Sequence, residues 1–252
     1  MSDTLTIRTN NISKRTYNNL LKQNKIHIAD IDDGKLKLVN KNYLETSNVL
    51  SSSMIDDLFE SYSSDYINKH YSDLSRYDKK NIIEKVKQND VQKNLSTYFL
   101  RDELNNYLTE YDELNISGFM KFRADEVKKI IRRTNEETID NYIVEKEYDT
   151  FIFALKNFIE SHEPLENELY VYIDKEQGIT YKNKKNEDIT KRIIRQWHNQ
   201  DIRNLMTQDD IFISILITIA PKKLHIHGLD NLKSKELRDT IKKIWGEKLY
   251  VY

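Results

Sequence analysis

The sequence predicts a helix-rich α/β or α+β protein, with a small β-α-β-β unit near the N-terminus and a β-hairpin plus an α-β-α-β unit near the C-terminus. Short alternating apolar runs, typical of strands, lie towards both ends of the chain. Apolar residues recur every three or four positions through the middle, which is typical of amphipathic helices. Only five glycines and two prolines interrupt 252 residues, so long helices are permitted.

The N-terminal residues 1–46 predict a small α/β unit. Leu5–Asn10 alternates like a short strand, and Ile12–Asn24 is an amphipathic helix. Lys25–Asn40 predicts a hairpin, because two alternating arms flank the dipeptide Asp33-Gly34, a strong two-residue turn signal.

Residues 47–163 predict a helical region, separated from the first unit at Ser47–Ser53. Thr134-x-x-Glu137 is a capping-box signal and Pro164 follows, so we expect a helix to begin near Thr134 and end before Pro164. Tyrosines at helical spacing are expected to be half-buried. The apolar positions expected to pack are Met54, Ile55, Leu58, Phe59, Tyr62, Tyr66, Val91, Leu95, Tyr98, Phe99, Leu104, Leu108, Ile139, Ile143, Val144, Tyr148, Phe151, Ile152, Leu155, Phe158 and Ile159.

Residues 164–252 predict a C-terminal α/β unit, which could form one domain with the helical region. Glu168–Asn183 alternates like a hairpin with Gly178 near its turn, and Glu187–Met206 follows as a helix. Lys223–His227 predicts a strand, and the remaining residues predict a helix and a last strand. A strand, a helix and a strand of this length favour two parallel strands joined by a right-handed crossover.

The run Asp209–Gly228 contains ten consecutive residues, Ile211–Ala220, that are almost all apolar. A transmembrane helix needs about 20 such residues, so membrane insertion is not expected. Strict alternation of isoleucine favours a strand, whereas Thr207-x-x-Asp210 before the run and Pro221 after it favour a helix. We predict a helix that is buried nearly all round.

The composition and motif content of the sequence argue against several classes of enzyme and binding protein. The formal net charge of −1 provides no global attraction to nucleic acid, and the absence of cysteine removes thiol nucleophiles, disulfides and zinc ribbons. The sequence has none of the common nucleotide-binding, metalloprotease or serine-hydrolase motifs, so no enzyme activity and no cofactor are predicted. No signal peptide is recognised, and we expect a cytoplasmic protein.

The strongest local charge signal is a basic stretch made of Lys121, Arg123, Lys128, Lys129, Arg132 and Arg133. On a helix the pairs Lys128/Arg132 and Lys129/Arg133 share a side, so the stretch could contact phosphate or a partner. Glu136 and Glu137 lie four residues beyond the two arginines, and a solvated face neutralised by these carboxylates is the simpler interpretation.

Glu147 and the pair His225/His227 could have either a functional or a structural role. Glu147 lies four residues from both Ile143 and Phe151, within the predicted apolar face, so a structural ion pair between Arg123 and Glu147 is predicted. His225 and His227 would share one face of a strand, and His198 might be a third metal ligand. No acidic residue completes such a site, so we predict no metal and expect a half-exposed strand face.

Three segments together resemble the YtxC-type sporulation proteins of endospore-forming Firmicutes. They are Leu114–Glu126, Tyr142–Ile173 and Asp209–Gly228 with the helix and strand that follow. The resemblance implies a cytoplasmic protein linked to sporulation, and it implies no reaction, cofactor or partner. We therefore predict a non-catalytic interaction or scaffold protein whose partner is another protein. Nucleic-acid binding through residues 121–133 is the alternative.

Overall fold

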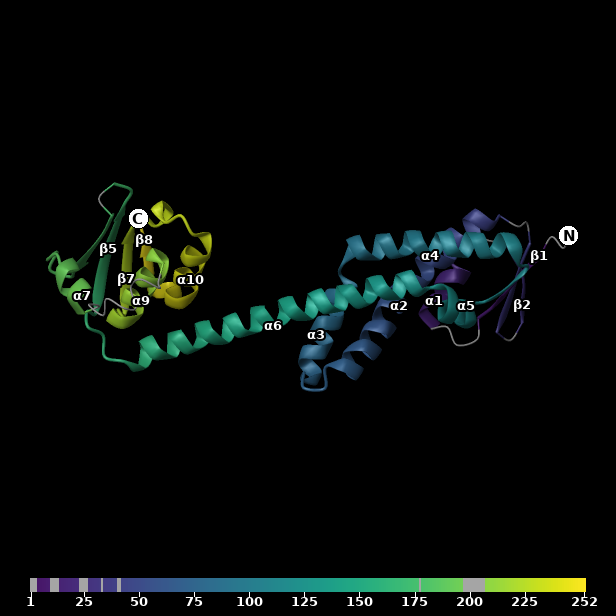
Figure 1. Ribbon diagram of the computed structural model, residues 1–252, viewed down its shortest axis with the longest axis horizontal. Coiled ribbons are helices and arrows are strands. Elements are labelled where there is room, and N and C mark those ends of the chain that lie inside the picture. The colour runs from purple at the N-terminus through teal and green to yellow at the C-terminus, as the bar shows by residue number, and fades with distance from the viewer. Residues whose placement is uncertain are drawn as a thin grey trace. The chain divides into compact units, whose positions relative to one another are not determined.

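The chain folds into two compact units, Met1–Ile143 and Val144–Tyr252. The computed structural model describes residues 4–9, 14–22, 27–32, 34–39, 42–176, 178–196 and 207–252 (Figure 1). We call the two units unit 1 and unit 2. Each has its own hydrophobic core, and the two cores share no residue. The division into residues 1–46, 47–163 and 164–252 stays a prediction.

Unit 1 begins with a four-stranded sheet in the order β2-β3-β1-β4. Its first three strands and one helix confirm the predicted β-α-β-β unit, and β4 is an addition that pairs parallel to β1. The sheet packs because alternate residues of β1 and β3, such as Leu5 and Leu36, are buried. The elements are β1 (Thr4–Arg8), α1 (Lys14–Leu21), β2 (His27–Asp32), β3 (Lys35–Val39) and β4 (Glu113–Asn115).

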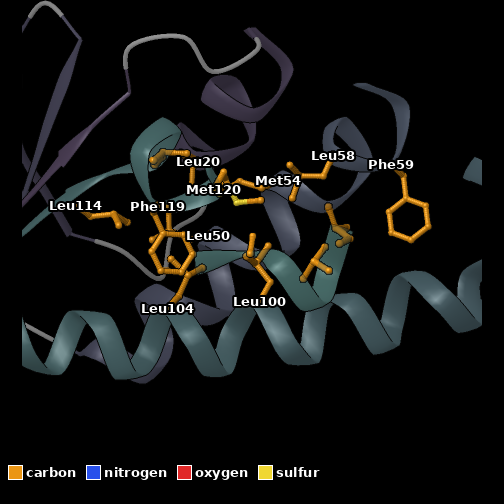
Figure 2. Close-up of a cluster of buried hydrophobic side chains, with 14 of the residues drawn as sticks. Leu20, Leu50, Met54, Leu58, Phe59, Leu100, Leu104, Leu114, Phe119 and Met120 are labelled. Carbon is orange, nitrogen blue, oxygen red and sulfur yellow. The ribbon is translucent and has the colours of Figure 1, made fainter. Parts of the chain in front are cut away.

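The rest of unit 1 is helical, and its core extends from the sheet, near Leu114, along the helices to Phe59 (Figure 2). Four of these helices begin at a side-chain cap, in which an asparagine or serine accepts from the backbone N–H three residues on. Leu50 of α2 and Leu100 of α4 are fully buried in this core. The helices are α2 (Tyr43–His70), α3 (Arg76–Lys87), α4 (Asp90–Glu110), α5 (Ile116–Arg123) and α6 (Asp125–Ser161), of which α6 continues into unit 2.

Two predicted helix boundaries are wrong. The predicted break at Ser47–Ser53 lies inside α2, where Ser47 and Ser51 donate their hydroxyls to backbone carbonyls three residues earlier. The predicted start at Thr134 lies inside α6, where its hydroxyl donates to the Ile130 carbonyl at 2.8 Å. Serine and threonine hydroxyls can donate hydrogen bonds to backbone carbonyls one turn earlier in the same helix. The presence of these residues therefore does not by itself mark the end of a helix.

Unit 2 contains a second four-stranded sheet, in the order β6-β5-β7-β8. The hairpin β5/β6 is antiparallel and β8 pairs parallel to β7, as predicted. The parallel pairing of β7 with β5 was not predicted. Only part of the helix predicted at Glu187–Met206 falls in the described residues, where it is α7. The elements are β5 (Glu168–Asp174), β6 (Gly178–Asn183), α7 (Thr190–Gln196), α9 (Gln208–Ile219), β7 (Lys223–His227), α10 (Lys235–Trp245) and β8 (Leu249–Val251), with short 3-10 turns at Leu229–Asn231 and Gly246–Lys248.

The apolar run Ile211–Ala220 is helical, as predicted, and forms most of α9. Thr207 and Asp210 form a reciprocal capping box at its start, and Ala220 adopts a left-handed conformation with φ of 48° just before Pro221. The helix is not buried all round, since Thr218 is exposed. Among the described residues, no helix is long and apolar enough to cross a membrane.

Candidate functional site

The predicted basic stretch is divided between two helices, α5 and the start of α6. Lys128 donates from Nζ to the Lys121 carbonyl at 2.8 Å and to Asp125 Oδ1 at 3.1 Å. Lys129 donates from Nζ to Glu126 Oε1 at 2.6 Å. Both lysines are therefore neutralised by carboxylates one turn earlier in the helix.

Two arginines of the stretch, Arg132 and Arg133, differ from these lysines. Arg132 and Arg133 are exposed, and neither forms a hydrogen bond or ion pair with the described part of the chain. Glu136, the expected neutraliser of Arg132, instead accepts from the Tyr66 hydroxyl at 2.9 Å. Burial of Tyr66, reinforced by Glu136, raises the pKa of its hydroxyl to about 12. Within the described residues, the guanidinium groups of Arg132 and Arg133 therefore have no carboxylate partner.

A pocket of about 350 Å³ brings three of the predicted residues together in unit 1. Of its cationic side chains, that of Arg132 has no carboxylate partner in the described ranges. Asn135 is fully buried and donates from Nδ2 to the Ile131 carbonyl at 2.9 Å, while its Oδ1 has no partner among the described residues. The lining residues are Tyr62, Tyr66, Asp125, Lys128, Lys129, Ile131, Arg132 and Asn135.

Glu147 is exposed on α6, so its carboxylate does not need a buried partner. Arg123 is exposed as well. This removes the reason for which an ion pair between Arg123 and Glu147 was expected, and the pair itself stays a prediction. The two residues belong to different units.

The largest departure from the sequence analysis is an exposed apolar face on α4. Val91, Leu95 and Phe99, which were expected to pack, are 75%, 43% and 37% exposed, and Tyr98, which was expected to be half-buried, is 54% exposed. We call these four residues the α4 stripe. They follow the spacing i, i+4, i+7 and i+8, so they lie on one side of the helix. The opposite side contains Leu100, Leu104 and Leu108, all fully buried.

The α4 stripe is held in place by contacts on both sides. Lys93 donates to Asp56 Oδ1 at 2.6 Å and links α4 to α2, and its side chain is only 18% exposed. The Arg101 guanidinium lies 4.9 Å from the centre of the Tyr98 ring, and Phe99 meets that ring edge-on at 5.8 Å. The stripe is therefore an ordered surface on a helix anchored to the core.

A second correction concerns α6 within unit 2. Val144, Phe151 and Phe158 were expected to be buried but are 65%, 55% and 39% exposed. The buried side of this segment is narrower and centres on Ile152 and Ile159. The apolar arc in the sequence is thus wider than the part that packs against unit 2.

The sheet of unit 2 has one packed face and one face covered by aromatic rings. Val171 and Ile226 are fully buried in the core on the packed face. On the other face the rings stack from strand to strand. We call them ring row 1 and ring row 2, and they consist respectively of Tyr170, His225 and Tyr250, and of Tyr172, His227 and Tyr252.

The geometry of the ring rows determines what they can bind. In row 1, the His225 ring lies 4.3 Å from Tyr170 and 4.6 Å from Tyr250, with interplanar angles of 8° and 13°. Row 2 repeats this arrangement, with His227 at 4.5 Å and 4.6 Å from its neighbours. Because each imidazole is stacked on both sides, its faces are closed to a flat ligand. The rows therefore present ring edges outward.

His225 and His227 share one face, as predicted for a strand, but stacking with tyrosine occupies them. His198, the proposed third metal ligand, lies outside the described residues. Within those residues, no group of three or more histidine, aspartate or glutamate side chains could hold a metal ion.

Lowering the pH is expected to destabilise unit 2 through His225. Burial between the rings, with smaller contributions from Lys223 and His227, lowers the pKa of His225 below its usual 6.5, against the opposing effect of Glu168. The unfolded chain then binds a proton more readily than the folded chain, so stability is complete above about pH 6.5 and falls as the pH drops below it. Urea unfolding followed by tryptophan fluorescence at neutral and mildly acidic pH measures this loss.

The variant His225→Phe is the control for this pH dependence, since it keeps an aromatic ring in row 1 and removes the titrating group. Its unfolding midpoint should vary less with pH than that of the wild type. An equal pH dependence in both proteins would show that His225 does not cause it.

These features define a helix-rich two-unit α/β protein with exposed apolar and aromatic surfaces. The model of the YtxC-like family matches residues 44–250, so the chain belongs to the YtxC-like family. A relative from Bacillus subtilis (strain 168), the "Uncharacterized protein YtxC", is 26% identical over 131 residues. The match covers 50% of this chain and 44% of that relative, so it spans less than half of the relative's length. No solved structure matches the chain.

Proposed function

We propose that this protein of the YtxC-like family is a non-catalytic interaction protein that acts in the cytoplasm during sporulation and binds a partner protein through the α4 stripe. The exposure of four apolar side chains on one side of an anchored helix carries the proposal. Single exposed apolar residues are common, whereas a contiguous apolar patch marks an interaction surface. The proposed role in sporulation and the proposed cytoplasmic location rest on the family resemblance. The proposed non-catalytic role rests on the motif content of the sequence.

The spacing of the α4 stripe indicates the chemistry of the partner. Anchors at i, i+4, i+7 and i+8 are those of an amphipathic helix that lies in an apolar groove. Tyr98 and Phe99 at its centre are residue types that supply much of the binding energy at interfaces. Arg101 beside them provides a cation at the edge of the patch, where an acidic residue of the partner could lie.

The proposal is tested by affinity capture from sporulating cells of the host with three forms of the chain. The wild type and the control Phe122→Glu should capture the same protein, because Phe122 is an equally accessible aromatic residue, 71% exposed, outside the stripe. The double variant Leu95→Glu/Tyr98→Glu should weaken capture of that protein by about thirtyfold or more, which corresponds to the loss typical of a hot spot (about 2 kcal/mol). Equal capture by all three forms would contradict the proposal.

Nucleic-acid binding through residues 121–133 is the second candidate, because Arg132 and Arg133 have no partner among the described residues. Binding of this kind weakens steeply with salt as phosphate counterions are released. Filter binding of single- and double-stranded probes at low salt tests it, with Arg132→Glu/Arg133→Glu as the variant. Binding that is salt-dependent and lost in the variant supports this candidate, and absence of binding at low salt removes it.

A further inference from the structure

The outer edge of β8 in unit 2 has backbone groups available for pairing. The strand order β6-β5-β7-β8 ends at β8, and no strand of the described residues pairs with its outer side. The Tyr252 N–H donates to the Ile226 carbonyl at 2.9 Å, and the Gly228 N–H donates to the Tyr252 carbonyl at 3.1 Å. Backbone groups alternate in direction along a strand, so the N–H and C=O of Val251 point towards the outer edge.

The side chains of this edge do not protect it from pairing. Tyr250, Val251 and Tyr252 are 39%, 49% and 64% exposed. Edge strands are commonly protected by lysine, proline, inward-pointing charges or a bulge. The segment Leu249–Tyr252 contains no charged side chain, proline or glycine. The edge is therefore an uncharged aromatic and aliphatic strand that can accept another strand.

The ring rows specify which strand would fit. Their ring separations of 4.3–4.6 Å are close to the strand spacing of about 4.8 Å, so a further strand would place its own rings on Tyr250 and Tyr252. The incoming strand must then have aromatic residues at alternate positions and a small apolar residue between them. Tyr250-Val251-Tyr252 is such a sequence, so β8 is complementary to itself.

We propose that β8 pairs with β8 of a second copy of this chain, antiparallel and centred on Val251. In this register the two Val251 residues exchange both of their free hydrogen bonds. Tyr250 of one copy lies opposite Tyr252 of the other, at non-hydrogen-bonded positions where side chains come closest. Each ring row then continues from one copy into the other. The exposed surfaces of both tyrosines and of Val251 become buried.

The pairing is short, so the dimer is weak and depends on concentration. Stable interfaces bury about 1,200–2,000 Å² in total, and two strands of this length bury less. Sedimentation equilibrium of the full chain over a wide range of concentrations is therefore the appropriate measurement. We expect the mass to rise from 30.2 kDa towards twice that value as the concentration increases.

Two edge variants and one control test the interface. Val251→Pro removes the free N–H donor, and Val251→Lys places a charge at the centre of the edge, so both should remain monomeric at concentrations where the wild type is dimeric. Phe153→Lys, at another exposed apolar residue of unit 2, should dimerise like the wild type. Unchanged circular dichroism in all variants verifies that they fold.

Three outcomes overturn the proposal. The first is a wild type that stays monomeric at every concentration, and the second is a dimer that persists in both edge variants. In the third, the wild type stays monomeric but binds another protein, and the Val251 variants lose this binding. The edge would then pair only with a strand of that protein. The α4 stripe lies in unit 1, so variants of the stripe and of the edge can be compared directly.

Discussion

Replacing Phe59 with alanine is expected to lower the free energy of unfolding of unit 1 by about 3–5 kcal/mol. Phe59 of α2 is fully buried and is among the largest side chains in the core of unit 1 (Figure 2). Removing its ring takes away apolar contacts and leaves a cavity that neighbouring helices cannot fully close. The same truncation at Phe122, which is 71% exposed, should cost less than about 0.5 kcal/mol.

Trp245 provides a measurement of this effect that distinguishes the units. It is buried in the core of unit 2, so its fluorescence, measured in a Trp197→Phe background, follows unit 2, whereas far-ultraviolet circular dichroism follows both units. In urea, Phe59→Ala should shift the circular dichroism transition to lower concentration and leave the fluorescence transition in place. An equal shift of both signals would show that the units unfold as one.

Replacing Trp245 with alanine is expected to destabilise unit 2 by a similar amount, about 3–5 kcal/mol. Trp245 at the end of α10 is 3% exposed, and its indole Nε1 donates to the Pro221 carbonyl at 3.2 Å. The substitution therefore removes a large apolar side chain and leaves a buried carbonyl without its donor. Trp245→Phe keeps most of the packing but removes the indole donor, so it should cost less than Trp245→Ala, about 1–3 kcal/mol.

Amide hydrogen exchange measured by mass spectrometry checks this prediction for each unit. Peptides from β5 and β7 should exchange faster in Trp245→Ala, and peptides from α2 and α4 should exchange at the wild-type rate. Faster exchange in α2 and α4 would contradict the independence of the two cores. Wild-type exchange in β5 and β7 would contradict the contribution of Trp245 itself.

The elements that could be predicted from the sequence are those whose signals are local. The hairpin of β5 and β6, the N-terminal hairpin and the capped helix α9 each depend on alternation, a turn residue or a cap within a few positions. The strand β4 could not be predicted, because only Leu114 is apolar in it and its pairing partner β1 lies about a hundred residues earlier. Non-local pairing leaves no local pattern in a three-residue strand.

The candidate surfaces also depend on contacts that leave no local pattern in the sequence. Periodicity identified the apolar residues of α4 but could not tell which side packs, because apolar residues occur on both sides of that helix. Leu104 and Leu108 are buried as predicted, while Val91, Leu95 and Phe99 of the stripe are exposed. The ring rows were missed because they combine residues of three strands, and neither sequence distance nor spacing relates Tyr170 to Tyr250.

The pairing of the charges in the basic stretch could not be predicted from their spacing. Spacing of i+4 suggested that Glu136 and Glu137 would neutralise Arg132 and Arg133. The lysines instead pair with carboxylates three residues earlier, and Glu136 accepts from Tyr66 of α2. Glu136 therefore bonds to a tyrosine of another helix rather than to Arg132, and the local sequence contains no pattern that predicts this contact.

The most direct test of the central claim is photo-crosslinking from the α4 stripe in sporulating cells. A photoreactive phenylalanine analogue is placed at position 95, in the stripe, and in a second strain at position 122, which is exposed outside it. We expect one dominant crosslinked protein from position 95, and little from position 122. Absence of a crosslink from position 95, or the same crosslinked proteins from both positions, would contradict the assignment of the α4 stripe as the partner surface.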